Sequence, residues 1–198
     1  DPRGAVDFLI EQILAHPHEV TLVVTGPMTN VALAMRREPK IVPLIPELVF
    51  MGGAWGYGNV NPAAEFNIWA DAEAADIVFR SGVPLVMMGL DLTRQALCYP
   101  EIVARMEKVG NRASGLFCAL MRYFCRTQKQ VFGWEGGPLH DPTTIAYLID
   151  PACIEIRGMY GEIDLSHGPS YGRTNCDTFH LQGLPDNVRV SVRLDVDR

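Results

Sequence analysis

The sequence predicts an open α/β fold with a mainly parallel central sheet and flanking helices, in a single domain over residues 1–198. Three short apolar runs, at residues 20–25, 47–53 and 83–89, are rich in Val, Leu and Met. Segments with helical spacing of apolar residues separate these runs. Alternating strands and helices are typical of a parallel sheet whose strands are joined by crossover helices.

The first half of the chain supplies the helices of this alternation. Near the N-terminus, apolar residues recur with helical spacing at Val6, Leu9, Ile10, Ile13 and Leu14. Pro17 ends this helix, and a second helix is expected over residues 29–37. Asp71 is a good N-cap for a third helix, which Gly82 closes. The three apolar runs then read as buried strands.

The second half begins with helices and ends with strands. Pro100 begins a helix with an inward face at Ile102, Val103, Met106 and Val109. The next helix has an apolar stripe at Ala113, Leu116, Phe117, Leu120, Met121 and Phe124. A short helix follows over residues 142–149. Beyond Pro151 the residues become β-like, and residues 188–196 alternate with a period of two.

Composition excludes several classes of partner. With 48% apolar and 20% charged residues, the chain has the balance of an ordered globular protein. The formal net charge is −6 and no block of Lys or Arg exceeds two residues, which disfavours nucleic acid. No apolar run approaches the length of a membrane span. The start, Asp1 to Gly4, does not resemble a signal peptide, so we expect a cytoplasmic location.

The cysteines do not indicate a metal or disulfide framework. Their number is odd and their spacing wide, at Cys98, Cys118, Cys125, Cys153 and Cys176. No pair stands at zinc-ligand spacing. Cys118 and Cys125 are expected to share one helix face. Buried thiols in a reducing compartment are the simplest interpretation.

Three polar segments follow expected strands, where a parallel sheet usually places its ligands. Residues 25–30 form a turn and a helix cap, or else their backbone groups face a ligand. Residues 51–67 carry several amides and one carboxylate, which suit hydroxyl groups such as those of a sugar, or else form a solvated loop. In residues 136–142, Asp141 caps the helix that follows, or else His140 is a general acid and Asp141 a ligand of a hard metal.

Together these segments resemble one family. The chain reads, in order, VTLVVTGPMTNVALAMRREP, VFMGGAWGYGNVNPAAEFNIWADAEAA, VPLVMMGLDLTRQA and GGPLHDPTTIAYLIDP. Four motifs in this order and spacing are similar to the inosine-uridine preferring nucleoside hydrolases, and the likeness runs through essentially the whole chain. It implies hydrolysis of the N-glycosidic bond of ribonucleosides to ribose and free base, by water bound to Ca²⁺.

The resemblance also assigns residues to the metal and the leaving base. Thr25, ahead of the GPMTN motif, would give its main-chain carbonyl to the calcium, and Asp141 would be a further ligand. His140 matches the histidine proposed to protonate the leaving base. Neutral bases leave poorly, so an acid at this position is chemically useful.

The ribose side falls to the central polar segment. Asn59, Glu65 and Asn67 match the family's ribose contacts, and Met51 and Phe66 match pocket residues beside them. Cleaving a ribosidic bond builds oxocarbenium-like charge on the sugar. Carboxylate and amide oxygens that are already in place can stabilise that charge.

Base preference is only partly readable. A histidine at His140 goes with the broad or pyrimidine-accepting members of the family. Residues 124–132 would lie over the base, and Gln128 either contacts a pyrimidine or is solvated at a helix end. Trp134 either stacks on the base or anchors its loop.

One family feature does not occur in residues 1–198. The family begins with a strand running into an Asp-x-Asp-x-Gly-x-Asp-Asp cluster, which supplies most side-chain calcium ligands and the general base. We therefore expect a domain trimmed of its N-terminal part and its last helix. A naturally shortened, inactive protein is the competing explanation. The isolated chain is expected neither to bind calcium tightly nor to hydrolyse nucleosides.

Two other classes of function stay open. The chain could be a non-catalytic module that binds nucleoside or ribose, or a structural fragment that completes a partner's sheet. An uncovered sheet edge would favour association, so we expect a homo-oligomer, a dimer or tetramer.

Overall fold

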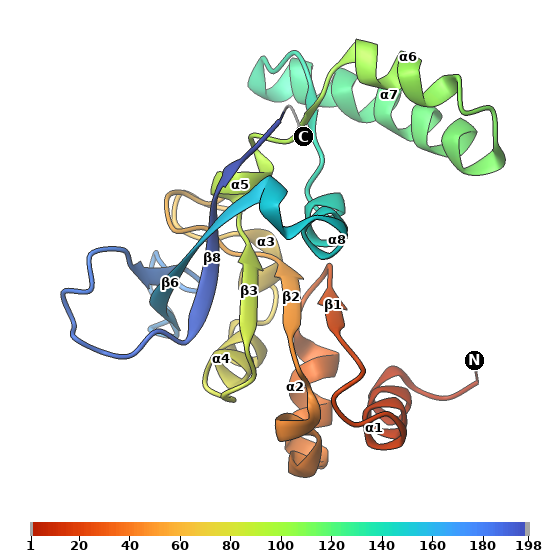
Figure 1. Cartoon of the computed structure of the whole chain (residues 1–198). Helices are drawn as coiled ribbons and strands as arrows, with labels where there is room; N and C mark the ends of the chain where they lie inside the picture. The colour runs from red at the N-terminus through yellow and green to blue at the C-terminus, as the bar shows by residue number, and fades with distance from the viewer. Residues whose placement is uncertain (1, 197–198) are drawn as a thin grey trace.

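The computed structural model describes residues 2–196, which are built around one central sheet (Figure 1). Its strands are β1 (Leu22–Val24), β2 (Leu48–Met51), β3 (Leu85–Met88), β6 (Ile154–Ile163), β7 (Thr174–Asp177) and β8 (Val188–Leu194). Within the described residues the strand order is β1-β2-β3-β8-β6-β7. β1, β2, β3 and β8 are parallel, whereas β6 is antiparallel to β8 and to β7. The expected mainly parallel sheet is confirmed.

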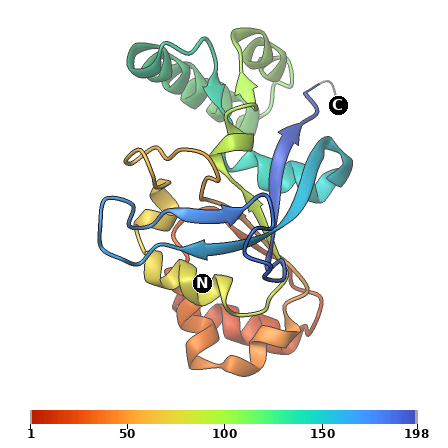
Figure 2. The same ribbon diagram turned by 90° about the vertical axis from the view of Figure 1, so that its left-hand side faces the viewer.

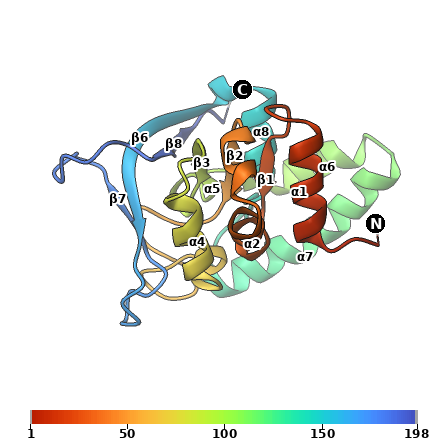
Figure 3. The same cartoon turned by 90° about the horizontal axis from the view of Figure 1, so that it is seen from below.

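Helices lie on both faces of this sheet. They are α1 (Ala5–Ala15), α2 (Thr29–Arg37), α3 (Phe66–Trp69), α4 (Ala72–Phe79), α5 (Leu90–Thr93), α6 (Pro100–Glu107), α7 (Arg112–Phe132) and α8 (Pro142–Ile149), with short 3-10 helices η1 (Pro39–Leu44) and η2 (Pro151–Cys153). Figure 3 shows α1, α2 and α4 side by side, and α8 contacts β2 from the other face. In the part of the chain that the structure describes, no helix combines the length and apolar character needed to cross a bilayer.

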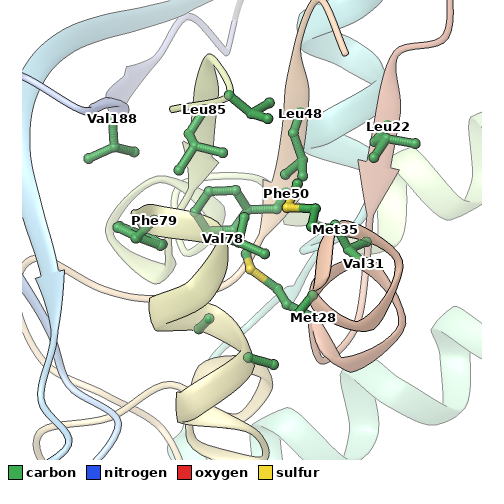
Figure 4. Packing of buried hydrophobic residues seen from close by; sticks show 14 of the residues in the cluster. Leu22, Met28, Val31, Met35, Leu48, Phe50, Val78, Phe79, Leu85 and Val188 are labelled. Atoms are coloured by element: carbon green, nitrogen blue, oxygen red, sulfur yellow. The ribbon is translucent and has the colours of Figure 1, made fainter. Parts of the chain in front are cut away.

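The period-two geometry of the strands divides the core into two layers. Alternate residues of β2 and β3 enter different clusters, with Phe50 and Leu85 facing α2 and α4, and Val49 and Val86 facing α8. Figure 4 shows the larger cluster, in which Phe50 is fully buried. The Phe50 and Phe79 rings meet edge to face, with centroids 5.7 Å apart. The sheet is thus a rigid base for the loops at its carboxyl edge.

α6 and α7 form a hairpin that stands beyond the carboxyl ends of β1, β2 and β3, at the opposite end of the molecule from α1 and α2 (Figures 1 and 2). It has its own small core of Cys98, Val103, Cys118 and Met121. A short antiparallel pair, β4 (Leu97–Cys98) and β5 (Gly137–Pro138), lies at its base. The hairpin therefore extends over the edge at which ligands usually bind to parallel sheets.

The prediction that Val109 faces inward is wrong, and part of the apolar stripe on α7 is exposed. Leu116 and Leu120 of the expected stripe are 63% and 60% exposed, and Val109 is 57% exposed. The described part of the chain packs against α7 mainly from the α6 side, and this contact buries the face that carries Cys118 and Met121. Val109 lies beyond the end of α6. Cys118 and Cys125 do share one face, as expected.

β1 is also less buried than the sequence suggested. Leu22 is buried, but Val23 is 37% exposed. Among the described residues β1 is an end strand, paired only with β2. An end strand has one open edge, so a run of apolar residues does not by itself distinguish it from a central strand.

Candidate functional site

A cavity of about 450 Å³ opens at the carboxyl edge of the sheet. Its walls come from the loop after β2, from α5, from α7 and the loop that follows it, and from the segment that joins β5 to α8. The lining residues are Tyr57, Gly58, Asn59, Asn61, Pro62, Leu90, Arg94, Phe124, Gln128, Phe132, Trp134 and His140. One wall is polar and comes from the loop after β2, and another is aromatic and comes from α7 and from Trp134 just after it.

The polar wall is a tight loop whose shape is held by hydrogen bonds to the side chains of two asparagines. Asn61 Oδ1 accepts hydrogen bonds from the N–H groups of Ala63 and Ala64, both at 2.8 Å. Gly58 N donates to Pro62 O at 3.0 Å, which closes the loop. Asn59 Oδ1 accepts from Phe66 N at 2.9 Å. Asn59 Oδ1 therefore helps to order the loop, while the side-chain nitrogen Nδ2 can still donate to a ligand.

Glu65 is the N-cap of α3 and is almost fully buried, at 2% exposure. Its carboxylate accepts from Gly53 N, Asn67 N and Ile68 N at 2.9 to 3.3 Å. Burial raises the pKa of Glu65, the three N–H donors lower it, and the Asp141 carboxylate raises it further. An acidic group held this rigidly beside Asp141 suits a ligand that carries positive charge or hydroxyl groups.

Asn67 and Met51 form a second polar contact behind the cavity wall. Asn67 Nδ2 donates to Met51 O at 3.0 Å, which leaves Asn67 Oδ1 as an acceptor. Met51 is buried and packs against Ala54 and Leu90. Leu90 in turn lines the cavity. Phe66 is 51% exposed and is not among the residues that line the cavity.

His140 is held in the cavity wall by a buried threonine. Thr93 is fully buried, and its Oγ1 lies 2.7 Å from His140 Nδ1. Burial, and secondarily the Arg94 charge, lowers the pKa of His140 to about 4. The imidazole is therefore neutral at neutral pH. We assign the Thr93 hydroxyl as the donor, which places the ring proton on Nε2.

The two predicted calcium ligands lie outside the cavity lining. Thr25 follows β1, one residue beyond the Val24–Phe50 pair, and so lies at the same sheet edge as Met51. Asp141 occupies the N-cap position of α8, but its side chain makes no capping hydrogen bond. Its carboxylate is therefore not used as a cap, and partial desolvation raises its pKa.

The described residues fit only part of a calcium shell. Residues 2–196 contain no group of three or more His, Cys, Asp or Glu side chains that could hold a metal. Calcium takes six to eight oxygens, with several carboxylates in tight sites. The Asp141 carboxylate and the Thr25 carbonyl are of the right chemical type but too few.

Another wall of the cavity is aromatic. Phe132 and Trp134 stack with centroids 4.9 Å apart, and both line the cavity with Phe124. Gln128 lies in the same wall, and its amide is a hydrogen-bonding side chain among these rings. A planar heterocycle is the ligand that such a surface suits, because rings supply stacking area and the amide supplies direction.

Of the site residues that the sequence predicted, three line this cavity: Asn59, Gln128 and His140. Sequence reasoning overlooked Tyr57, Asp91, Thr93 and Arg94. The last three lie within the LDLTRQA motif directly after β3, a strand end where ligands gather, so position alone was a usable signal. Tyr57 had no signal of its own, because an aromatic residue in a glycine-rich loop is common.

Comparisons with known proteins agree on one kind of protein. The family model described as inosine-uridine preferring nucleoside hydrolase matches residues 1–198. A pyrimidine-specific ribonucleoside hydrolase RihB of Shigella flexneri serotype 5b is 51% identical over 193 residues, which is 98% of this chain and 62% of that protein. The RihB protein of Escherichia coli O1:K1 has the same identity and coverage. The chain thus spans less than two thirds of these relatives.

Solved structures give the same picture. A purine-preferring ribonucleoside hydrolase from Gardnerella vaginalis superposes with a TM-score of 0.91 at 34% identity, covering all of this chain and 63% of that one. A plant nucleoside hydrolase, PpNRh1, also gives a TM-score of 0.91, at 28% identity and 64% of its chain.

Proposed function

Since this chain belongs to the inosine-uridine preferring nucleoside hydrolase family, we propose that the full-length protein hydrolyses the N-glycosidic bond of ribonucleosides and prefers pyrimidine bases. The observation that carries this proposal is one cavity with a polar loop on one side, stacked aromatic rings on the other and His140 in its wall. A ribonucleoside has the same two halves, a polyhydroxylated sugar and a planar base.

The ribose is assigned to the loop after β2. Asn59 Nδ2 and Asn67 Oδ1 keep hydrogen-bonding capacity after their contacts within the protein are satisfied. The buried Glu65 carboxylate supplies negative potential where the sugar develops oxocarbenium-like charge. These groups are fixed by backbone contacts before the ligand arrives, so little reorganisation accompanies the reaction.

The base is assigned to the wall built by α7. Phe124, Phe132 and Trp134 offer stacking surface, and the Gln128 amide can pair with the carbonyl and N–H edge of a pyrimidine. With its proton on Nε2, neutral His140 can donate a hydrogen bond to the departing base, and its lowered pKa means that it acts there as a neutral donor and not as an imidazolium acid. The 51% identical relatives are named pyrimidine-specific, which supports this preference.

Calcium is proposed as the cofactor. The Asp141 carboxylate and the Thr25 carbonyl would hold it together with groups outside the described residues. When bound, the ion lowers the pKa of a coordinated water and so supplies a nucleophile at neutral pH. The residues of this chain would then orient the ribose and the base around that water.

A homo-oligomer and a cytoplasmic location are further parts of the proposal. Leu116, Leu120 and Tyr123 form an exposed apolar stripe on α7, of the kind that subunit contacts cover. Cys98, Cys118, Cys125 and Cys176 are free thiols, which suits a reducing compartment. Native mass spectrometry measures the first, and fractionation of the source cells measures the second.

Ribose release by the purified full-length protein tests the proposal. We expect turnover of uridine and cytidine to exceed that of inosine, to stop on chelation with EGTA and to return with Ca²⁺. A His140→Gln variant, which keeps a side-chain N–H donor but not the imidazole ring, tests the part played by His140. Absence of ribose release from all nucleosides would contradict hydrolysis.

Non-catalytic nucleoside binding is the alternative, because a cavity with a polar loop and stacked rings could also hold a nucleoside without cleaving it. Calorimetric titration with uridine and inosine, with and without Ca²⁺, separates the two. Binding without turnover in the full-length protein would support the alternative.

A further inference from the structure

Four consecutive residues of the loop after β2 are held by the short helix α5. Asp91 Oδ2 accepts from the N–H groups of Trp55 and Gly56, at 2.8 and 3.3 Å. Arg94 donates from Nη1 to Tyr57 O at 3.0 Å and from Nη2 to Gly58 O at 2.8 Å. Asp91 thus binds the N–H groups of the first two residues of this segment, and Arg94 binds the carbonyl groups of the next two.

Two further contacts tighten this arrangement. The Arg94 guanidinium lies 4.3 Å from the centroid of the Tyr57 ring, a cation–π contact. A Cβ added at Gly56 would clash with Asp91 Oδ1. A side chain at position 56 would therefore displace the Asp91 carboxylate that holds the loop. Arginine is the cation whose planar group can both stack on a ring and donate two hydrogen bonds.

The base of this contact is itself rigid. Leu92 is fully buried, and Gln95, two residues beyond the end of α5, donates from Nε2 to Asp91 O at 2.8 Å and to Val192 O at 3.1 Å. Gln95 Oε1 also accepts from Leu194 N at 3.0 Å. α5 is therefore fixed to β8, so movement of the loop relative to α5 is movement relative to the whole sheet.

The same helix also holds the other side of the cavity. Thr93, between Asp91 and Arg94, contacts His140. Asn59 directly follows Gly58, the last residue that Arg94 holds. α5 thus sets the position of the polar loop and of His140 from one rigid turn. Reacting groups need to be placed to within a fraction of an ångström for efficient catalysis.

We propose that Asp91 and Arg94 are positioning residues that clamp the Trp55–Gly58 segment, and through it Asn59, in the geometry needed to bind ribose opposite His140. This inference rests on the proposed nucleoside hydrolysis. It assigns neither residue to the reacting atoms. Both act through the backbone of the loop.

Hydrogen exchange and kinetics on the full-length protein test the clamp together. In Arg94→Met and Asp91→Ala, exchange of peptides covering residues 55–64 should accelerate by about tenfold, because freed backbone groups open more often. The kcat/KM for uridine should fall by about tenfold or more. Arg94→Lys keeps the charge but not the two parallel donors, so it should recover only part of the activity. Methylguanidinium should partly restore Arg94→Ala.

Arg80→Met is the control, because Arg80 also pairs with a carboxylate, that of Asp76, but does not line the cavity. It should leave exchange at residues 55–64 and kcat/KM unchanged. Unchanged exchange in Arg94→Met would overturn the clamp, and so would kcat/KM within twofold of wild type. Reduced activity with unchanged loop exchange would mean that Arg94 acts on the ligand directly, which also overturns it. If the wild-type protein releases no ribose, the proposed function fails, while the exchange measurement still decides the clamp.

Discussion

Thr93 Oγ1 and His140 Nδ1 lie 2.7 Å apart, although the residues are 47 positions apart in the sequence. This contact joins α5, directly after β3, to the start of α8. It also determines which nitrogen of the ring faces the cavity. The Thr93 hydroxyl therefore fixes the orientation of the His140 ring, as second groups do for histidines in many sites.

Thr93→Val should lower kcat for uridine by about tenfold, the effect of about 1.4 kcal/mol in the barrier. Valine has nearly the same shape, so the buried site stays filled while His140 loses its orienting hydrogen bond. Thr93→Ser keeps the hydroxyl and is expected to retain most of the activity. Steady-state kinetics of the full-length variants measure this. Equal activity of Thr93→Val and wild type would remove the orienting role.

Gly58→Ala should reduce activity strongly with a small effect on global stability. A Cβ at Gly58 would overlap the Ala64 backbone carbonyl, so the loop that carries Asn59 has to open. We expect KM for uridine to rise by about tenfold, because misplaced groups lose binding energy. Gly115→Ala is the matched control, since a Cβ there meets no atom within 4 Å and the position is helical. It should be neutral or stabilising, by about 0.5–1 kcal/mol.

Much of the fold is readable from the sequence because its signals are local. α2 ends just before Pro39, and α8 begins at Pro142 and ends just before Pro151, as proline chemistry predicts. Asp71 caps α4 by accepting from Ala74 N at 3.0 Å. The exposed Leu116 and Leu120 were not readable, because their burial depends on which elements surround α7. Periodicity indicates an apolar face but not its partner.

The sequence predicted the polar loop and His140 as parts of the candidate site, but it did not predict the residues that hold them in place. Asn59 and Glu65 stand out as polar groups after a strand. Asp91 and Arg94 look like ordinary charges on a short helix until the structure brings the Trp55–Gly58 backbone against them. Contacts between side chains and distant backbone leave no spacing pattern in a single sequence.

Cys176 is expected to be chemically inert in the folded protein. Burial, with a smaller contribution from Asp91, raises the pKa of its thiol to about 12. At pH 8 only ~10⁻⁴ of such thiols are ionised, and the thiolate is the reactive form. Iodoacetamide should therefore label Cys176 at least about a hundredfold more slowly in the native protein than in urea. Peptide mass spectrometry measures the labelling, and equal rates in both states would show that the thiol is not protected.

Asp141 should contribute strongly to calcium binding in the full-length protein. The residue sits at the start of α8 without capping it, so its carboxylate is available for a cation. Asp141→Asn keeps the volume and removes the charge, and we expect the affinity for Ca²⁺ to fall by about a hundredfold, because calcium relies on carboxylate ligands. Ribose release should then require a correspondingly higher Ca²⁺ concentration. Asp76→Asn, which removes a carboxylate paired with Arg80, is the control and should leave Ca²⁺ affinity unchanged.

Calcium binding by residues 1–198 alone provides a second test of this assignment. Since residues 2–196 lack a group of three or more potential metal-binding side chains, calorimetry should detect only weak Ca²⁺ binding, in the millimolar range typical of sites with few charged ligands, at about 10⁻³ M. The same titration on the full-length protein should give far tighter binding, which Asp141→Asn weakens by about a hundredfold. Tight binding by residues 1–198 would mean that other groups of this chain, and not Asp141 with outside ligands, hold the ion.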